Sequence, residues 1–410
     1  MKEAEFVDEV RAAGGRVFIA GGWVRDFFRG ADAKDKDYVL AGLSEAIFNR
    51  LFPDARKVGK SFPVYVMKLD GKLAEIAFCR TERKSGAGYR GFAVSYDPSV
   101  TIEEDLKRRD TTMNSMAMEL PTGEVLDPFD GRGDIVKKKI RATSEHFCED
   151  PVRALRAARQ AAELGFSIEE ETLRKMEACK AEIKDEPQER LFQEMERALQ
   201  TKQPSVFFRM LEQAALLEAT FPEIFALIGQ SQPLSYHPEG DAFQHSLQVL
   251  DRVASFDERP LVRFAALVHD IGKGCTKKEL LPHHYEHEKV GVRVLWQWKA
   301  RMNFPAKWLQ AAEFAISQHM RAPGLKKAGK VMDFLLAAEK NPLGLPGICA
   351  IIEADHKSLP LYLAGYAARL DVIHRVSTDS CPADYRGKAI GEWLRNARLN
   401  AYIKAFGNLS

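Results

Sequence analysis

Two aspartates separated by one residue follow a pair of glycines near the start of the chain. In RVFIAGGWVRDFFRGADAKDKDYVL an apolar run leads into Gly21 and Gly22, and a second strand-like run carries Asp35 and Asp37. Side chains two apart on a strand share a face, and two carboxylates on one face can hold two divalent ions for phosphoryl transfer. Glycine amides and the following helix start favour a bound phosphate. In this order and spacing the residues favour a nucleotidyl-transferring head, although either feature alone is more often a turn or a solvated edge.

These residues and the motifs that follow them resemble the tRNA nucleotidyltransferase family, in particular the bacterial class II CCA-adding enzymes. Those enzymes share a head with bacterial poly(A) polymerases. The segments that carry the resemblance occur in family order: GGWVRD, DKDYVL, RTERKSGAGYRGF (80–92), EEDLKRRDTTMNSMAM (103–118), DPFDGRGDI (127–135) and EDPVRALRAAR (149–159). The chain departs from the family at FFRG, where the usual sequence is LLG. Linked motifs in one order are far more specific than any single motif.

The segment KRRDTTMNSMA carries polar side chains that can sense a ribose. Arg109 can grip phosphate or ribose oxygens, Asp110 can accept a hydrogen bond from a ribose hydroxyl, and Asn114 follows Asp110 at helical spacing. This arrangement favours a site that excludes deoxynucleotides. The same residues alone are typical of a helix with surface salt bridges, so the interpretation rests on the neighbouring motifs.

Three further residues of the head belong to the same hypothesis. Arg25 and Lys34 would add cationic contacts to a triphosphate. Glu75, in the strand-like run LAEIAF, is either a third acid beside the two aspartates or a charge at a strand edge. Both interpretations of Glu75 stay open. The glycine of the turn that we expect to contact the nucleotide is Gly22.

The stretch EDPVRALRAAR begins a helix with two acids, an early proline and three arginines spaced three apart. The resemblance implies that Asp150 and Arg153 act as a protein template for the incoming base. Cytosine and adenine present an amino donor beside a ring-nitrogen acceptor, whereas uracil and guanine present an oxygen acceptor beside an N–H donor. A carboxylate next to a guanidinium complements the first order only. Arg156 and Arg159 are then candidates for contacts with the triphosphate or with RNA.

Arg80, Arg83 and Lys84 open a basic segment with two glycines, which predicts a flexible loop over residues 80–92. In the family that the chain resembles, this loop is needed when C addition changes to A addition, and enzymes that stop after CC tend to lack it. Its presence argues against a CC-only enzyme. Full CCA addition and addition of the terminal A alone remain alternatives.

A second set of candidate ligands lies in the C-terminal half, which holds every histidine except His146. The series H…HD…H…H…D resembles an HD-type metal phosphohydrolase domain, and its members are His245, His269, Asp270, His287, His319 and Asp355. Imidazoles and carboxylates suit Ni²⁺ or another divalent transition metal, and an ion there can activate water for phosphoester hydrolysis. The resemblance implies 2′,3′-cyclic phosphodiesterase, 2′-nucleotidase and phosphatase activities. Lys273, which follows this HD pair, could face a phosphate.

The elements that must position these residues divide the chain into a mixed head and a helical remainder. Strand-like runs alternate with turns over the first 140 residues or so, and a 3.6-residue apolar period follows. We therefore expect an α+β fold in which a head with a mixed sheet precedes an all-α neck and body and an α-helical HD domain. The resemblance adds that the head is polymerase-beta-like. The expected divisions are a nucleotidyltransferase head at 1–140, a neck and body that bind nucleotide and tRNA at 141–230, an HD domain at 231–345 and a helical tail at 346–410.

Composition limits these hypotheses. The 410 residues contain 60 Lys+Arg and 58 Asp+Glu, a formal net charge of +2, so any nucleic-acid binding must rest on local basic patches. The 45% hydrophobic and 29% charged residues are typical of a globular protein. The six cysteines form no CxxC motif, and no window approaches 18 apolar residues. We therefore expect reduced thiols and a cytoplasmic protein without a membrane segment.

The leading hypothesis is template-independent addition of CMP and AMP to the acceptor end of tRNA. The substrates would be CTP and ATP, the metal Mg²⁺ held by Asp35 and Asp37, and the leaving group pyrophosphate. Alternatives within the class are an A-adding enzyme, a less favoured CC-adding enzyme and a poly(A) polymerase. From other classes, the chain could be a catalytically silent tRNA-binding protein, or the HD domain could be its principal activity. A monomer and a homodimer both fit the sequence.

Overall fold

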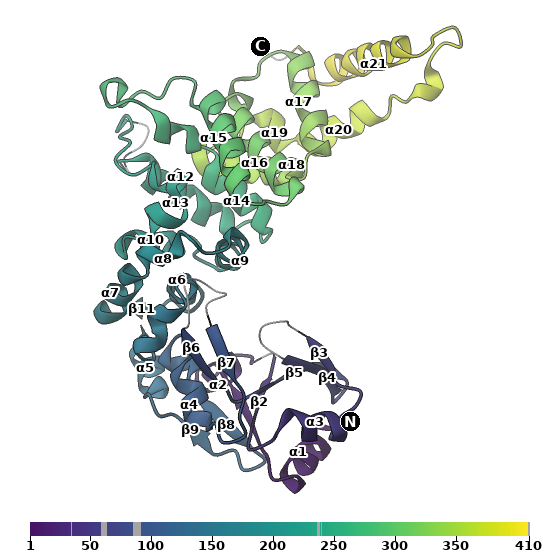
Figure 1. The fold of residues 1–410 in the computed structure, drawn as a ribbon. Helices are drawn as coiled ribbons and strands as arrows, with labels where there is room; N and C mark the ends of the chain where they lie inside the picture. Colours follow the sequence, from purple (N-terminus) through teal and green to yellow (C-terminus); the bar gives the residue numbers. More distant parts are fainter. Residues whose placement is uncertain (34, 59–63, 85–91, 236–237, 239, 409–410) are drawn as a thin grey trace. The chain divides into compact units, whose positions relative to one another are not determined.

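The computed structural model describes residues 1–33, 35–58, 64–84, 92–235, 238 and 240–408, with the backbone only for 82–84 and 92–95. The chain forms two compact units (Figure 1). The first consists of Met1–Glu194 and Val206–Thr220, and the second of Met195–Ser205 and Phe221–Ser410. The predicted fold class is confirmed, because a mixed sheet occupies the N-terminal part and helices follow it.

A mixed seven-stranded sheet forms the centre of the head, in the order β3-β4-β5-β2-β1-β8-β9. β2 and β5 run parallel, and the other neighbours are antiparallel. The central strands β1 and β2 are buried along all but their first residue, as expected where both faces of a sheet are covered. The strands are β1 (Arg16–Ala20), β2 (Asp37–Ala41), β3 (Arg56–Val58), β4 (Val64–Leu69), β5 (Lys72–Phe78), β8 (Ala117–Leu120) and β9 (Val125–Leu126).

Helices and two small sheets complete the head. The small sheets pair β6 (Thr81–Lys84) with β7 (Phe92–Ser95) in antiparallel fashion, and β10 (Lys139–Ile140) with β11 (Ser167–Ile168) in parallel. The helices are α1 (Glu3–Ala12), α2 (Gly22–Phe28), α3 (Glu45–Leu51), α4 (Ile102–Lys107) and α5 (Gly131–Lys137), with 3₁₀ turns η1 (Thr112–Asn114) and η2 (Glu145–Glu149).

Local sequence signals set where the motif-bearing helices begin and end. α2 follows Gly21, whose φ of 82° lies in the left-handed region that favours glycine. α4 begins with a capping box in which Thr101 and Glu104 satisfy each other's backbone N–H groups. α6 (Val152–Leu164) ends at Gly165, again at positive φ, which is the usual glycine position after a helix.

Short helices follow α6, and the second unit takes in the last residues of α9 and the first residue of α10. These helices are α7 (Glu170–Ala178), α8 (Lys180–Ile183), α9 (Gln188–Leu199), α10 (Ser205–Gln213) and α11 (Leu217–Thr220). Nine of the 13 residues of α6 are buried, Arg153 among them, while Arg156 and Arg159 stay partly exposed. The arginine side of α6 is directed toward polar partners.

The second unit is helical throughout its described residues. Its core joins apolar side chains of α13, α14, α16, α17 and α18, among them Val249, Ala266 and Ile348. Figure 1 shows α20 and α21 at the yellow end of the chain, where they contact each other and α17. The helices are α12 (Pro222–Phe225), α13 (Ala242–Ala254), α14 (Pro260–Val268), α15 (His287–Arg301), α16 (Ala306–Gln318), α17 (Ala328–Lys340), α18 (Gly344–His356), α19 (Leu361–Ala364), α20 (Tyr366–His374) and α21 (Lys388–Phe406), with 3₁₀ turns η3 (Ile271–Cys275), η4 (Lys278–Leu280), η5 (Ala322–Gly324) and η6 (Thr378–Ser380).

No single described helix is long and apolar enough to cross a membrane. Only when α17 and α18 are taken together do their length and apolarity suffice, and these two helices are bent by 113° at their junction.

Candidate active site of the head and candidate metal centre of the helical unit

Two acidic residues occupy matching positions on neighbouring strands in the middle of the head sheet. Asp37 is the first residue of β2, and Glu75 of the parallel strand β5 is its partner in register. β5 lies between β4 and β2, so Glu75 is not on an edge strand, which favours the third-acid interpretation. The prediction that one strand carries both aspartates is wrong for Asp35, because backbone pairing of β2 begins only at Asp37.

The electrostatic surroundings of Asp37 favour a cation. Partial loss of water contact raises the pKa of the Asp37 carboxyl, Arg109 acts against this rise, and the charges of Glu75 and Asp35 add to it. A divalent ion between these carboxylates would remove their mutual repulsion. Carboxylate oxygens are also the ligands that Mg²⁺ prefers in proteins. The acids of the head therefore fit a divalent metal.

Arg109 lies against the glycine turn and is held there by a buried carboxylate. Its Nε and Nη2 donate to Asp105 Oδ2 at 3.2 and 3.0 Å, while Arg108 Nε donates to Asp105 Oδ1 at 3.1 Å. Burial alone would raise the pKa of Asp105, but the two arginines outweigh it and lower the pKa. A Cβ at Gly21 would lie 3.0 Å from Arg109 Nη1, so the glycine admits the guanidinium. The sequence showed no sign of the role of Asp105.

Asp110 lies at the centre of a buried hydrogen-bond network. Its Oδ2 accepts from Arg156 Nε at 2.7 Å and from Gln160 Nε2 at 3.1 Å, and its Oδ1 accepts from Asn114 Nδ2 at 3.1 Å. Asn114 in turn accepts from Arg25 Nη1 at 3.1 Å. Burial opposes the charge of Asp110, yet the pKa falls far below its ordinary value because Arg156 and these donors stabilise the anion. The network therefore joins α2, η1 and α6.

The two residues expected to read the base lie on either side of the start of α6. Asp150 accepts from Val152 N at 3.1 Å and is gripped by both terminal nitrogens of Arg190, at 3.0 and 2.8 Å. Arg153 is buried and donates to the carbonyl of His146. Arg190 was not among the candidates, because it lies 40 residues from Asp150 and nothing in its local sequence marks it.

The other two arginines of α6 are engaged by acids. Arg159 donates to Glu194 Oε2 at 2.6 Å and to Glu163 Oε2 at 2.8 Å, and its side chain is 14% exposed. The side chain of Arg156, which pairs with Asp110, is 38% exposed. Of the two predicted contacts to phosphate or RNA, Arg156 thus has the more accessible side chain.

The remaining candidates of the head are only partly described. Gly22 is the first residue of α2, and Arg80 binds Asp105 through its backbone N–H at 3.3 Å. The backbone of Arg83 and Lys84 forms the end of β6. Their side chains, residues 85–91 of the predicted loop and Lys34 lie outside the described residues.

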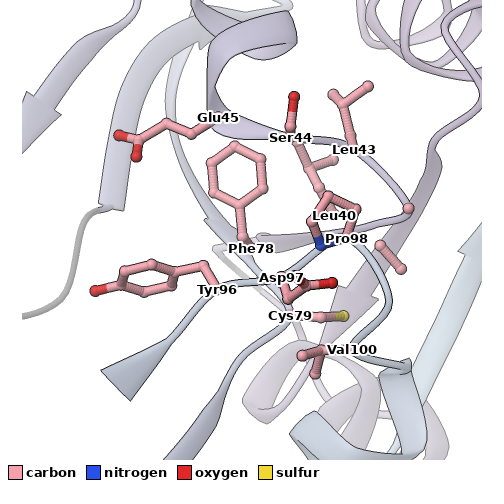
Figure 2. A pocket seen from close by; sticks show the side chains of 12 residues that line it. Leu40, Leu43, Ser44, Glu45, Phe78, Cys79, Tyr96, Asp97, Pro98 and Val100 are labelled. Carbon is pink, nitrogen blue, oxygen red and sulfur yellow. The ribbon is translucent and has the colours of Figure 1, made fainter. Parts of the chain in front are cut away.

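A small hollow lies at the other end of β2 (Figure 2). Leu40, Phe78, Cys79 and Tyr96 contribute to its wall, and its volume is about 80 Å³. Pockets for whole ligands commonly measure about 300–1,000 Å³. The hollow is therefore too small for a nucleoside triphosphate, and the acids and the glycine turn mark the candidate site.

All six predicted ligands of the second unit come together in its core. They come from α13, α15 and α18 and from the residues directly after α14 and α16, and each side chain is less than 10% exposed. His245 Nε2 lies 3.0 Å from Asp355 Oδ1, and His269 Nε2 lies 3.3 Å from Asp270 Oδ2. Three overlapping groups of these residues place their ligand atoms within 4.8 Å of one another.

The hydrogen bonds of three histidines aim their ligand nitrogens at this centre. His269, His287 and His319 each bring Nδ1 to a backbone carbonyl three residues earlier, at 2.7, 3.0 and 3.0 Å. A carbonyl only accepts, so each Nδ1 carries a proton and Nε2 is the ring nitrogen that faces the centre, where it could bind a metal. Burial lowers the pKa of His319, whereas for His269 and His287 the nearby Asp270 carboxylate outweighs burial and raises the pKa. The donor set therefore fits divalent transition metals.

Two residues beside the centre connect it to a larger hollow. Lys273 Nζ donates to Asp270 Oδ2 at 2.5 Å and to Gln232 Oε1 at 2.6 Å. Gln232 also lines a hollow of about 760 Å³ together with Ser231, Asp241 and Pro282. Gln232 was not predicted, because it is 41 residues from Lys273 in sequence. The hollow is large enough for a nucleotide.

Comparisons with known proteins find matches for both units. Family models match in three places: the poly A polymerase head domain at residues 17–141, the probable RNA and SrmB-binding site of polymerase A at 165–228, and the HD domain at 242–375. A CCA-adding enzyme in its apo form II has the same fold with a TM-score of 0.68 and 20% identity, covering 97% of this chain and 90% of that one. The CCA-adding enzyme of Bacillus stearothermophilus in complex with CTP has a TM-score of 0.67 and 22% identity, covering 98% and 92%.

Curated relatives are similar over nearly the whole length. The multifunctional CCA protein of Hahella chejuensis is 38% identical over 415 residues, which is 95% of each chain. That of Xanthomonas oryzae is 39% identical over 412 residues, or 95% of this chain and 98% of the relative. The resemblance seen in the linked motifs is thereby confirmed. The chain belongs to the multifunctional CCA protein family.

Proposed function

We propose that the head adds C, C and A in sequence to the acceptor end of tRNA, from CTP and ATP and without a nucleic-acid template. The pairing of Asp37 with Glu75 in the centre of the sheet, with Asp35 just before it, carries this proposal. These acids would hold Mg²⁺, which supplies activation of the attacking hydroxyl and stabilisation of the leaving oxygen. Arg109, fixed against the glycine turn, would bind the triphosphate.

The residues around α6 would select the nucleotide. Asp150 and Arg153 would offer an acceptor and a donor to the Watson–Crick edge, and Arg190 would hold the Asp150 carboxylate in one orientation. The ribose would be sensed next to the network of Asp110 and Asn114. Five protein groups already donate to Asp110, so a ribose hydroxyl would have to share or replace one of them.

The test offers each NTP separately to tRNAs that end before CCA, after C and after CC. We expect C on the first two and A on the third. Incorporation of U or G as readily as C and A would refute the template pair, and addition only to the tRNA ending in CC would identify an A-adding enzyme. Repeated A addition to unrelated RNA would identify a poly(A) polymerase. Asp37→Ala should abolish incorporation, whereas the exposed control Asp32→Ala should retain it.

The second unit would act as a metal-dependent phosphohydrolase with 2′,3′-cyclic phosphodiesterase, 2′-nucleotidase and phosphatase activities. The convergence of six buried ligands beside a hollow of about 760 Å³ supports this role. Ni²⁺ or another divalent transition metal would supply the activation of water. Lys273, at the boundary between the centre and Gln232, would meet the phosphate.

Hydrolysis of a 2′,3′-cyclic nucleotide tests this second activity. His269→Ala should abolish metal-dependent hydrolysis while nucleotide addition continues, and the exposed control His374→Ala should change neither. Equal loss of both activities in His269→Ala would mean that the histidine is structural.

The finer organisation belongs to the same proposal. We place the head at 1–140, the neck and body at 141–230, the HD domain at 231–345 and the helical tail at 346–410, with Asp355 of this tail completing the ligand set of the HD domain. We expect a cytoplasmic protein that acts as a monomer or homodimer, and sedimentation of the purified chain distinguishes these two states.

A further inference from the structure

Two cysteines of the first unit lie beside the same backbone carbonyl. Cys148 Sγ lies 3.5 Å and Cys179 Sγ 3.3 Å from the carbonyl oxygen of Lys175. A hydrogen bond also joins the two cysteine side chains, and it is the largest of the effects that raise the pKa of the Cys179 thiol. Cys148 belongs to η2 and Cys179 directly follows α7, so all of α6 lies between them in the sequence. The fold therefore brings two distant thiols within bonding reach.

The two thiols differ in accessibility and in ease of ionisation. Cys179 is 2% exposed, whereas Cys148 is partly exposed. Besides the hydrogen bond to Cys148, burial and the charges of Asp150 and Glu182 raise the pKa of Cys179. That thiol therefore stays protonated and is placed to donate to the Cys148 sulfur, which stabilises a thiolate at Cys148.

Two cationic side chains bind the backbone of the turn that carries Cys148. Lys175 Nζ donates to the carbonyl of Ser144, the residue before η2, at 3.4 Å, and Arg153 Nη1 donates to the carbonyl of His146. Reactive cysteines in proteins are partly exposed and lie near cationic groups. Cys148 thus has the features of an attacking thiol, and its buried partner has those of the thiol that resolves the first oxidation product.

We propose that Cys148 and Cys179 are a peroxide-sensitive pair that forms a reversible disulfide in the first unit. The Cys148 thiolate attacks hydrogen peroxide; an S–O bond forms, the O–O bond breaks, and the leaving hydroxide takes up the thiol proton as water. The Cys179 sulfur then attacks the resulting sulfenic acid; the S–S bond forms, the S–O bond breaks, and the hydroxyl group leaves with the Cys179 proton as water. The two thiols lose two electrons, and one peroxide is reduced to two waters.

The disulfide would act on the residues proposed to read the base. A covalent S–S bond is shorter than a hydrogen-bond contact between sulfurs, and Cys179 is fixed by burial, so η2 has to move toward α7. The carbonyl of His146 in η2 orients Arg153, and Asp150 is two residues after Cys148. Oxidation therefore displaces the base-reading pair and slows nucleotide addition. This consequence rests on the proposed function of the head, whereas formation of the disulfide does not.

Peptide mapping of the full chain tests the thiol pair. The reduced protein is treated with hydrogen peroxide, the remaining thiols are alkylated, and trypsin then places Cys148 in peptide 142–153 and Cys179 in peptide 176–180. We expect these peptides to be linked after oxidation and to separate in dithiothreitol. Cys148→Ser and Cys179→Ser should each abolish the linked species. In the matched control Cys275→Ser, which replaces an exposed cysteine of the second unit, the link should form as in wild type.

Nucleotide addition is measured on the same samples. Because a small displacement of a positioning residue can cost about 100-fold in rate, oxidation should reduce kcat/KM for CTP at least about fivefold. Dithiothreitol should restore the original value. Cys148→Ser should add CTP as fast as the reduced wild type and should keep that rate in peroxide.

The outcomes separate this inference from the proposed function. Unlinked peptides after oxidation, or Cys148 converted to sulfinic acid instead, overturn the thiol pair. Linked peptides with an unchanged rate of addition support the modification site and overturn its effect on the start of α6. If the reduced protein adds no nucleotide to any tRNA, the proposed function fails, and the linked peptides still decide the thiol pair. If Cys179→Ser fails to fold by circular dichroism, the partly exposed position Cys148→Ser decides the assignment.

Discussion

Replacing Asp110 by asparagine removes one negative charge from the head while the side chain keeps its shape. The aspartate is 5% exposed and accepts from Arg156, Gln160, Asn114 and the backbone of Thr111. An asparagine turns its NH₂ group toward one set of these donors. Breaking a buried ion pair costs about 3–5 kcal/mol, but the Arg156 side chain is 38% exposed and recovers part of this from water. We therefore expect a loss of about 2–3 kcal/mol of local stability.

Amide hydrogen exchange read by mass spectrometry measures this loss in the segment concerned. A cost of about 2–3 kcal/mol accelerates exchange of peptides from η1 and α6 by roughly 30- to 150-fold where exchange follows the opening equilibrium. Peptides of the second unit serve as an internal reference. The matched control is Asp130→Asn, whose side chain is 66% exposed, and it should leave the rates within a factor of about two.

The pH dependence of the stability difference provides a second test of the same substitution. The pKa of Asp110 is lowered in the fold, so its contribution to stability is fully present above the ordinary aspartate pKa of about 3.9 and is lost as the pH falls toward the folded value. The difference between wild type and Asp110→Asn should stay constant between about pH 7 and 5 and shrink below about pH 4. Unchanged exchange at neutral pH, or a difference that grows on acidification, would refute this account of the network.

Further predictions concern glycine contact, backbone anchoring and base selection. Gly272→Ala places a Cβ 2.0 Å from the first carbonyl of α15, so it should abolish metal binding in the second unit and leave nucleotide addition intact. In the control Gly391→Ala the new Cβ has no atom within 4 Å, and this variant should bind metal normally. Arg263→Ala removes donors to four backbone carbonyls and should lower the stability of the second unit by about 3–5 kcal/mol in urea unfolding; a loss below about 1 kcal/mol would contradict this. Arg190→Ala frees the Asp150 carboxylate and should reduce the kcat/KM preference for CTP over UTP at least about tenfold, whereas an unchanged ratio would remove Arg190 from base selection.

Sequence spacing predicted the parts of the sites that local structure determines. The glycine turn before α2 and the histidine-aspartate pair after α14 lie where the pattern indicates, because each depends on a few consecutive residues. The α+β head followed from short strand-like runs separated by turns, and the helical remainder from an apolar period of 3.6 residues. Asp35 was misplaced on β2, because the start of a strand depends on its neighbours and here both begin to pair at about Asp37.

The supporting residues could not be found in this way. Arg190 reaches Asp150 across 40 residues and Gln232 reaches Lys273 across 41, and such pairs depend on how helices pack rather than on spacing within one helix. Asp105 looked like one of several acids at the start of α4, yet it is the residue whose burial fixes two arginines beside the glycine turn. One sequence predicts the groups that carry chemistry better than the groups that orient them, because the orienting contacts are long-range.

The two units place their acids in opposite settings, and this difference has consequences for how each metal is held. Asp35, Asp37 and Glu75 are exposed, so water reaches these carboxylates when no ion is bound, although Asp37 loses enough of it to raise its pKa. Asp270 is 2% exposed among four histidines, and without an ion the fold carries the cost of burying unsatisfied polar atoms. A ligand that binds only the folded state raises the free energy of unfolding, and this increase grows with the logarithm of the ratio of ligand concentration to Kd. A metal bound in the second unit would therefore add to the free energy of unfolding of that unit, whereas a metal bound in the head could arrive and leave with the nucleotide.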